Sequence, residues 1–358
     1  MLGPVSTTSS LGSRYREIDV SGRPREMGRQ VGEATAHEIQ AFRDHTLEWI
    51  ARSDGLSLAA ALEIAAGSLA HVDRYDPHQL DELRGVADGS RVPLEHVMLL
   101  NVRNQLSADD SACTSLAWPA GWRGRGPTVA QNWDNDPSLD AFIVVVRRRP
   151  EHQAPILTVG PAGLIAYIGL NGNGIGACLN ALPAPGRDSG VPHYFTLRGI
   201  FGSRDLDGAV AAVSRAQRAI PANIMLTTPQ GPADLEVMID EVHVLRPTHG
   251  DALTHTNHCL HPDLLAIAGS VPNLLQSRAR KRRLDELLDG SGSPLDDPVE
   301  VLRDHVGRPG SICRHANGER EQGAWVTVFS VIIEPQSGRM RVSRGNPCTH
   351  PYETYLLA

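Results

Sequence analysis

Lysine is almost absent from this sequence: Lys281 is the only lysine, and all other basic side chains are arginines. We attribute this bias, with the many Ala and Gly residues, to nucleotide composition rather than to function. The formal net charge is −7 at pH 7, so the chain lacks the basic excess that attracts nucleic acids or anionic membranes. Neither is expected to be the main partner.

Long hydrophobic runs are also missing, since no segment approaches the roughly 18 apolar residues that span a bilayer. Residues 1–14 are rich in Ser, Thr and Gly and have no basic stretch followed by an apolar one. They are not typical of a secretion signal. We therefore expect a cytoplasmic protein.

Cysteine is sparse and unpatterned. The five cysteines are Cys113, Cys178, Cys259, Cys313 and Cys348, and no two have Cys-x-x-Cys spacing. An odd number of scattered cysteines argues against a disulfide framework, so we expect reduced thiols. The length of 358 residues, 41% of them hydrophobic, allows one large or two ordinary domains with a sizeable core.

Helical spacing of apolar residues dominates the first hundred positions. It predicts helices over 25–51, 58–72, from 77 to about 85–89, and 93–99, with Pro77 and Pro93 at helix starts. Further helices are expected at 193–201, 206–216, 273–288 and 298–305. The segment 1–112 is thus expected to be mostly helical.

From Cys113 the apolar period changes to two, which predicts strands. The expected strands are 113–117, 128–133, 142–147, 156–159, 164–169, 176–180, 223–228, 235–240, 241–245, 324–333 and 340–343. We interpret those between 113 and 180 as a meandering antiparallel sheet. Helices, sheet, helices and sheet in that order, with no clear domain linker, indicate a layered α+β domain with two central sheets.

Cys113 lies where a polar run gives way to the first predicted strand. A lone cysteine there is more often a small buried hydrophobe than a nucleophile. Polar residues elsewhere favour a nucleophile, because the Gly- and Pro-rich loop 119–127 would return Asp134 to the thiol. Asn180, Asn257 and Arg314 add further polar signals.

Short motifs in order through most of the chain strengthen this interpretation. They are Arg23-Pro24-Arg25-Glu26-Met27-Gly28, Val97-Met98-Leu99-Leu100-Asn101, Ala112-Cys113-Thr114-Ser115, Gln131-Asn132-Trp133-Asp134, Gly169-Leu170-Asn171, Leu179-Asn180-Ala181, His255-Thr256-Asn257-His258-Cys259 and Ser311-Ile312-Cys313-Arg314. With them the sequence resembles the autoproteolytic acyltransferase family of the N-terminal nucleophile hydrolases, the group that includes isopenicillin N acyltransferase.

The resemblance implies a four-layered αββα fold with two central antiparallel sheets, and self-cleavage between Ala112 and Cys113. The segments 1–112 and 113–358 would stay associated as two chains of one fold. The freed α-amino group of Cys113, which titrates near pH 8, would then serve as the base for its own thiol. Family members commonly have Gly before the nucleophile, where this chain has Ala112.

The resemblance also implies roles for other residues. Asp134 would hold the thiol or the ammonium, and Asn257 would donate to the oxyanion, with Asn180 a second candidate. Arg314 would stabilise a nearby negative charge. Ser115, Thr114 and Trp133 are candidates for assisting cleavage or binding substrate. The ordinary alternatives are turn-capping, a surface ion pair and core packing.

His255, His258 and Cys259 carry zinc-binding side chains. In an extended segment His255 and His258 point to opposite faces, and no further ligand lies at a typical spacing. We therefore expect no metal and no dissociable cofactor. The implied partners are a small-molecule acyl donor, with acyl-coenzyme A as a possible co-substrate, and an amine or water as acceptor.

Two alternatives stay open. One is an amidase or peptidase without transferase activity, since the sequence does not show whether water or an amine takes the acyl group. The other is an uncleaved, non-catalytic binding protein on the same scaffold, which Ala112 makes plausible. The mass of the purified chain discriminates between the second alternative and an enzyme.

Overall fold

The computed structural model describes residues 12–53, 55–106, 112–248, 251–270, 276–289, 295, 297–316 and 325–358. Within these ranges the strands form two sheets. The strands of the first, in spatial order, are β1 (Glu17–Gly22), β4 (Ile143–Pro150), β5 (Ile156–Pro161), β6 (Ile168–Asn171), β7 (Gly176–Ala181), β8 (Ala222–Thr228), β9 (Gly231–Val237) and β10 (Val242–Leu245). Those of the second are β11 (Leu253–His255), β2 (Ala112–Trp118), β3 (Thr128–Asn135), β12 (Val326–Glu334), β13 (Arg339–Arg344) and β14 (Tyr352–Leu356).

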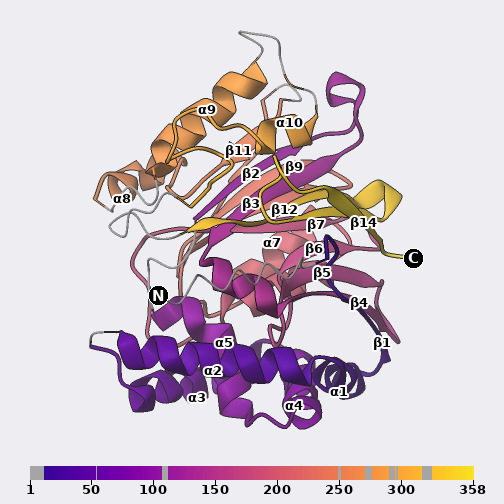
Figure 1. Ribbon diagram of the computed structural model, residues 1–358, viewed down its shortest axis with the longest axis vertical. Coiled ribbons are helices and arrows are strands. Elements are labelled where there is room, and N and C mark those ends of the chain that lie inside the picture. The colour runs from indigo at the N-terminus through magenta and orange to yellow at the C-terminus, as the bar shows by residue number, and fades with distance from the viewer. Residues whose placement is uncertain are drawn as a thin grey trace, which may run out of the picture.

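The two sheets pack face to face, with β2 and β3 against β7 and β8, and helices cover both outer faces (Figure 1). On the larger sheet lie α1 (Pro24–Ala34), α2 (Ala36–Arg52), α3 (Leu58–Tyr75), α4 (Pro77–Ser90), α5 (Leu94–Leu106), α6 (His193–Phe201) and α7 (Leu206–Ser214). On the smaller sheet lie α9 (Ser277–Asp289) and α10 (Pro298–Leu302), with α8 (Leu265–Ser270) nearby. The expected four-layered αββα arrangement is confirmed.

Most pairs within the sheets are antiparallel, as expected, but β1 pairs with β4 in parallel. The single meander expected between residues 113 and 180 is wrong. The strands β2 and β3 belong to the smaller sheet, and the chain crosses through the 3-10 turn Pro137–Phe142 into β4 of the larger one. Alternating apolar residues identify a strand but do not specify which sheet it joins.

The helix expected over 25–51 is two helices, because the backbone of Thr35 departs from helical geometry at φ −118° and ψ 24°. The first of them, α1, crosses α4 at glycines on both sides. A Cβ on Gly28 would lie 1.9 Å from the carbonyl oxygen of Glu82, and one on Gly85 would lie 2.2 Å from that of Arg25. These glycines therefore allow the two helix backbones to touch.

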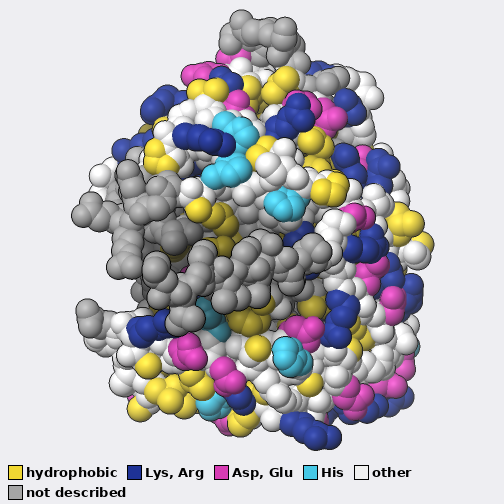
Figure 2. All heavy atoms as spheres, in the orientation of Figure 1, with side chains coloured by type: hydrophobic (Ala, Val, Ile, Leu, Met, Phe, Trp, Pro, Cys, Tyr) yellow, Lys and Arg dark blue, Asp and Glu magenta, His cyan; other side chains and the backbone are white. Residues whose placement is uncertain are grey.

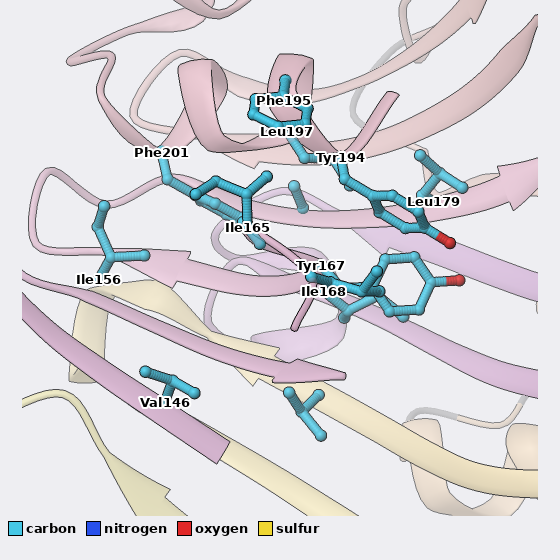
Figure 3. Close-up of a cluster of buried hydrophobic side chains, with 14 of the residues drawn as sticks. Val146, Ile156, Ile165, Tyr167, Ile168, Leu179, Tyr194, Phe195, Leu197 and Phe201 are labelled. Carbon is cyan, nitrogen blue, oxygen red and sulfur yellow. The ribbon is translucent and has the colours of Figure 1, made fainter. Parts of the chain in front are cut away.

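Buried hydrophobic side chains fill all three interfaces between the layers. Figure 3 shows part of the core, in which Phe195, Leu197 and Phe201 of α6 belong to one buried cluster with Ile156 and Ile168 of the larger sheet. The rings of Tyr167 and Tyr194 in the same view meet edge to face, with centroids 5.3 Å apart. The larger buried cluster contains residues from both sides of Cys113, so the described parts of 1–112 and 113–358 pack on one core.

On the face shown in Figure 2, basic and acidic side chains are interspersed. None of the helices in the described ranges combines the length and the apolar character that crossing a bilayer requires.

Candidate active site

Cys113 lies at the start of β2, and a hairpin joins β2 to β3 as the sequence predicts. Ala112 pairs with Asp134 and Cys113 pairs with Trp133 across the two strands. Asp134 is thereby brought back to the peptide bond before Cys113. The Cys113 side chain is fully buried, and it packs with the core between the two sheets.

Two buried side chains hold the backbone of Cys113 on both sides of its Cα atom. Its N–H donates to Oδ1 of Asn257 at 3.0 Å. The Arg280 guanidinium donates to the Cys113 carbonyl oxygen at 2.6 Å and to Oδ1 of Asn257 at 2.8 Å. Asn257 and Arg280 are both fully buried, so this arrangement is held rigidly around the candidate nucleophile.

Arg280 was missed in the sequence, where α9 appears simply as a strongly charged helix. Its buried side chains are Ser277, Arg280, Leu284 and Leu288, which form one helical stripe. An arginine in a stripe of apolar residues is the signal that could have identified it. At that position it also donates to Oγ1 of Thr114 at 2.9 Å.

The thiol of Cys113 is held in its protonated form. Burial raises its pKa well above the usual range, and the negative charge of Asp134 adds to the increase. The positive charge of Arg280 and backbone hydrogen bonds from Asp134 and Ala181 act in the opposite direction. A proton acceptor is therefore needed before the sulfur can attack.

Asp134 is buried beside this thiol with one oxygen satisfied. Its Oδ1 accepts a 2.7 Å hydrogen bond from Thr327 on β12, whereas Oδ2 is buried without a hydrogen-bond partner in the described part of the chain. Burial raises the pKa of Asp134 to about 6, although Arg280, Thr327 and Arg314 oppose the increase. The carboxyl group thus titrates near neutral pH, where acid–base catalysts commonly do.

Arg314 approaches the same carboxyl group through Thr327. Its backbone N–H donates to Oγ1 of Thr327 at 2.9 Å, and its charge lowers the pKa of Asp134. One guanidinium nitrogen donates to Gln276 at 3.1 Å. The other, Nη2, is buried without a hydrogen-bond partner among the described residues. A buried cation with an unused donor is suited to receiving an anionic group.

Asn180 belongs to a buried hydrogen-bond network that neighbours Cys113. Its Nδ2 donates to Oγ of Ser115 at 2.9 Å and to the Thr256 carbonyl oxygen at 2.8 Å, and its Oδ1 accepts from Gln131. Asn180 therefore ties β7 to β2 and to the segment that carries Asn257.

Ser115 receives this bond from Asn180, and Thr114 faces Arg280. The Trp133 ring packs against Phe329 and Tyr167, with centroids 5.0 and 6.0 Å away. Trp133 is thus in the core next to the nucleophile.

His255, His258 and Cys259 do not converge. Nε2 of His255 lies 2.9 Å from Oε1 of Glu236, both side chains being fully buried, while His258 bonds to Ser277 at 2.7 Å. Cys259 packs in a separate apolar cluster. Burial alone would lower the pKa of His255, but the charges of Asp234 and Glu236 raise it overall.

The sequence profile of the acyl-coenzyme A:6-aminopenicillanic acid acyl-transferase family matches residues 122–349. The match covers more than half of the chain. This chain belongs to that family. It is therefore an enzyme of an acyl-transferring family, and the resemblance described above is confirmed. The matched range contains Asp134, Asn180, Asn257, Arg280 and Arg314, and it begins after Cys113.

Solved structures with similar folds are distant. A conjugated bile acid hydrolase from Clostridium perfringens is 11% identical, with a TM-score of 0.45 over 68% of this chain and 96% of that one. Penicillin V acylase from Agrobacterium tumefaciens is 12% identical, with a TM-score of 0.44 over 68% of this chain and 86% of that one. Family membership rests on the profile match alone.

Proposed function

We propose that this enzyme transfers or hydrolyses acyl groups through a thioester on Cys113, after the chain cleaves itself between Ala112 and Cys113. The observation that supports the proposal best is the set of groups around Cys113. Asn257 and Arg280 hold the N–H and the carbonyl group of Cys113, and the buried thiol lies beside an ionisable carboxyl group. Any buried cysteine needs partners for its backbone, but a purely structural one needs no ionisable carboxyl group beside its thiol.

In the first step, Sγ of Cys113 attacks the carbonyl carbon of Ala112. The new carbon–sulfur bond forms as the peptide carbon–nitrogen bond breaks, and the Cys113 nitrogen takes a proton to become an amine. Water then attacks the thioester, which yields the Ala112 carboxylate and a free thiol. The Asn257 oxygen keeps the Cys113 nitrogen in place during this exchange, because it accepts the hydrogen of that nitrogen.

Asp134 is the group assigned to move the proton in the uncleaved chain, where no free amine exists. With a pKa of about 6 it is ionised at pH 7, and Oδ2 is unpartnered among the described residues. Its charge already acts on the thiol. Asp134 would thus accept the thiol proton and return it to the departing nitrogen.

After cleavage the α-amino group of Cys113 would take over as base, since a free amine of that kind titrates near pH 8. The thiolate would attack an acyl donor, expel its thiol or amine, and pass the acyl group to an amine or to water. The family description favours acyl-coenzyme A as donor and an amine as acceptor. Asn257, or Asn180 behind it, would donate a hydrogen bond to the oxyanion. Arg314 would bind a negatively charged group. No dissociable cofactor enters this scheme.

An acyl-donor screen tests the proposal. Purified wild type is incubated with acyl-coenzyme A esters of increasing chain length, with and without an added amine, and free coenzyme A is followed. Release that needs an amine indicates a transferase, and release without one indicates a hydrolase. Cys113→Ala should abolish release, whereas Cys259→Ala, which removes another buried thiol, should not. Equal release by the Cys113→Ala variant would refute the thioester mechanism.

A further inference from the structure

Four metal-binding side chains converge outside the candidate active site: His305, Cys313, His315 and Cys348. They come from three separate segments, namely the turn after α10, the stretch before β12 and the turn between β13 and β14. Their ligand atoms all lie within 4.8 Å of one another. Cys313 is buried and the other three are half-buried, so the cluster is largely shielded from solvent.

The distances between the ligand atoms are close to those around a tetrahedral ion. Nε2 of His315 lies 3.1 Å from Nε2 of His305 and 3.2 Å from Sγ of Cys348. Sγ of Cys313 lies 3.6 Å from Nε2 of His315 and 3.7 Å from Sγ of Cys348. Zinc bonds of ordinary length to nitrogen and sulfur place ligand atoms about 3.3 to 3.8 Å apart in a tetrahedron. The two distances from Cys313 fall in this range, and the other two are slightly shorter.

Hydrogen bonds alone do not account for this arrangement. One ring nitrogen, Nε2 of His315, faces His305, Cys313 and Cys348 at once. A neutral imidazole nitrogen carries either one hydrogen or one lone pair in the ring plane, so it satisfies one such partner well and not three. A cation between the four atoms satisfies all of them together.

We propose that His305, Cys313, His315 and Cys348 form a structural zinc site. Two thiolates and two imidazoles are a ligand set typical of protein-bound zinc. Four protein ligands leave no open position, which is typical of structural rather than catalytic zinc. Nδ2 of Asn346 lies 3.5 Å from Sγ of Cys313 and supplies the outer hydrogen bond that such thiolates usually receive.

The site would also position Arg314, and this part rests on the proposed function. Arg314 lies between two of the ligands in sequence, and its carbonyl oxygen accepts a 2.6 Å hydrogen bond from Asn346. Its backbone N–H donates to Oγ1 of Thr327, and that hydroxyl in turn donates to Asp134. An ion on Cys313 and His315 would fix the segment on both sides of Arg314. The expectation of no metal would then be wrong, because ligands far apart in sequence gave no recognisable spacing.

Metal analysis of the full-length protein, purified with a reducing agent and without chelators, tests the site. Wild type should carry about one zinc ion per chain. Cys348→Ser and His305→Ala should lose it, whereas Cys259→Ser and His261→Ala should keep it. The last control removes a histidine from a more exposed group formed by His243, His261 and Asp263. Cobalt replacing the zinc in wild type should give the intense visible bands of a tetrahedral ion with thiolate ligands.

A wild-type protein that binds neither zinc nor cobalt while Cys313 and Cys348 are both reduced would overturn the proposal. These readouts do not depend on activity. A zinc-loaded chain that neither cleaves itself nor turns over an acyl donor would refute the proposed function and leave the metal site standing. If both hold, removing zinc from wild type should slow self-cleavage, and adding zinc should restore it.

Discussion

The side-chain oxygen of Asn257 accepts the N–H of Cys113 at 3.0 Å and a guanidinium N–H of Arg280 at 2.8 Å. On its other side, Nδ2 donates to the Ala181 carbonyl oxygen at 2.9 Å. Two donors on one side and an acceptor on the other fix the orientation of the amide. In the uncleaved chain Asn257 is thus an acceptor at the peptide bond before Cys113, and donation to an oxyanion requires its Nδ2 to leave Ala181.

Asn257→Ala should slow turnover by about 100-fold or more, the usual cost of losing an oxyanion-stabilising amide, and it should also slow self-cleavage. It removes the acceptor for Cys113 and the partner of Arg280 together. Cleavage is followed by gel electrophoresis over time, and turnover by release of free coenzyme A. Asn173→Ala, in the turn between β6 and β7, is the control and should retain both rates. A fully active Asn257→Ala variant would show that the amide has no part in the reaction.

Arg280→Lys should lose most of the cleavage rate although it keeps the positive charge. A lysine ammonium cannot present the planar fork with which Arg280 binds Cys113, Thr114 and Asn257 together. Arg282→Lys is the matched control, since Arg282 is exposed on the same helix and should tolerate the change. The measurement is the cleaved fraction of each folded variant after a fixed incubation, which should be low for Arg280→Lys and normal for Arg282→Lys. Equal cleavage by the two variants would contradict a role for the fork.

The rate of self-cleavage should rise with pH through about 6. The pKa of Asp134 is raised to about 6, so the carboxylate that accepts the thiol proton forms only as pH exceeds that value. Asp134→Asn should cleave slowly at every pH and lose this rise. Asp188→Asn, in an exposed loop, should keep the wild-type profile. A pH profile that is identical in wild type and Asp134→Asn would show that another group is the base.

Asp134 should also reduce the stability of the folded chain at neutral pH. Its pKa is higher in the folded state than the ordinary 3.8, so the folded state binds the proton more tightly. Its contribution is most favourable below pH about 4, declines as pH rises to about 6, and is unfavourable by on the order of 3 kcal/mol above that. Asp134→Asn should remove this decline. The check is the difference between the unfolding free energies of Cys113→Ala chains with and without Asp134→Asn, both uncleaved, at pH 4 and pH 8.

Gly28→Ala should destabilise the fold by about 1 to 3 kcal/mol or more, because its methyl group would overlap the backbone of α4 at Glu82. Glu82 is a buried carboxylate that binds both Arg148 and Arg198, so a shift of α4 also disturbs these two ion pairs. Gly269→Ala is the control, since nothing lies within 4 Å of a Cβ there. Urea unfolding measures the free energy of unfolding of both variants. Unchanged stability of Gly28→Ala would show that the helices separate without cost.

The sequence predicted local structure well and long-range partners poorly. Helical spacing predicted α3 and α6 with nearly correct bounds, but the same spacing continues from Met27 to Ile50 and hides the break at Thr35. Strands β11 and β14 were not predicted as strands. The short β11 has only three residues, too few to show a period.

The candidate site shows the same division. The β2–β3 hairpin that pairs Ala112 with Asp134 follows from two adjacent strands and a Gly- and Pro-rich loop, so it was predictable. Asn257 and Arg314 were noted as polar signals, but their roles came only from the family resemblance. Arg280 and Thr327 were missed because their partners lie 167 and 193 residues away along the chain. The roles of all these residues stay predictions.

The central claim is that Cys113 becomes a chain terminus by cutting its own backbone. Intact-mass measurement of purified wild type tests it most directly, with Cys113→Ala as the uncut reference. The account predicts two masses in wild type, those of residues 1–112 and 113–358, and a single full-length mass in Cys113→Ala. The account is contradicted if the wild-type chain stays whole and the Cys113→Ala variant turns over an acyl donor as fast as wild type.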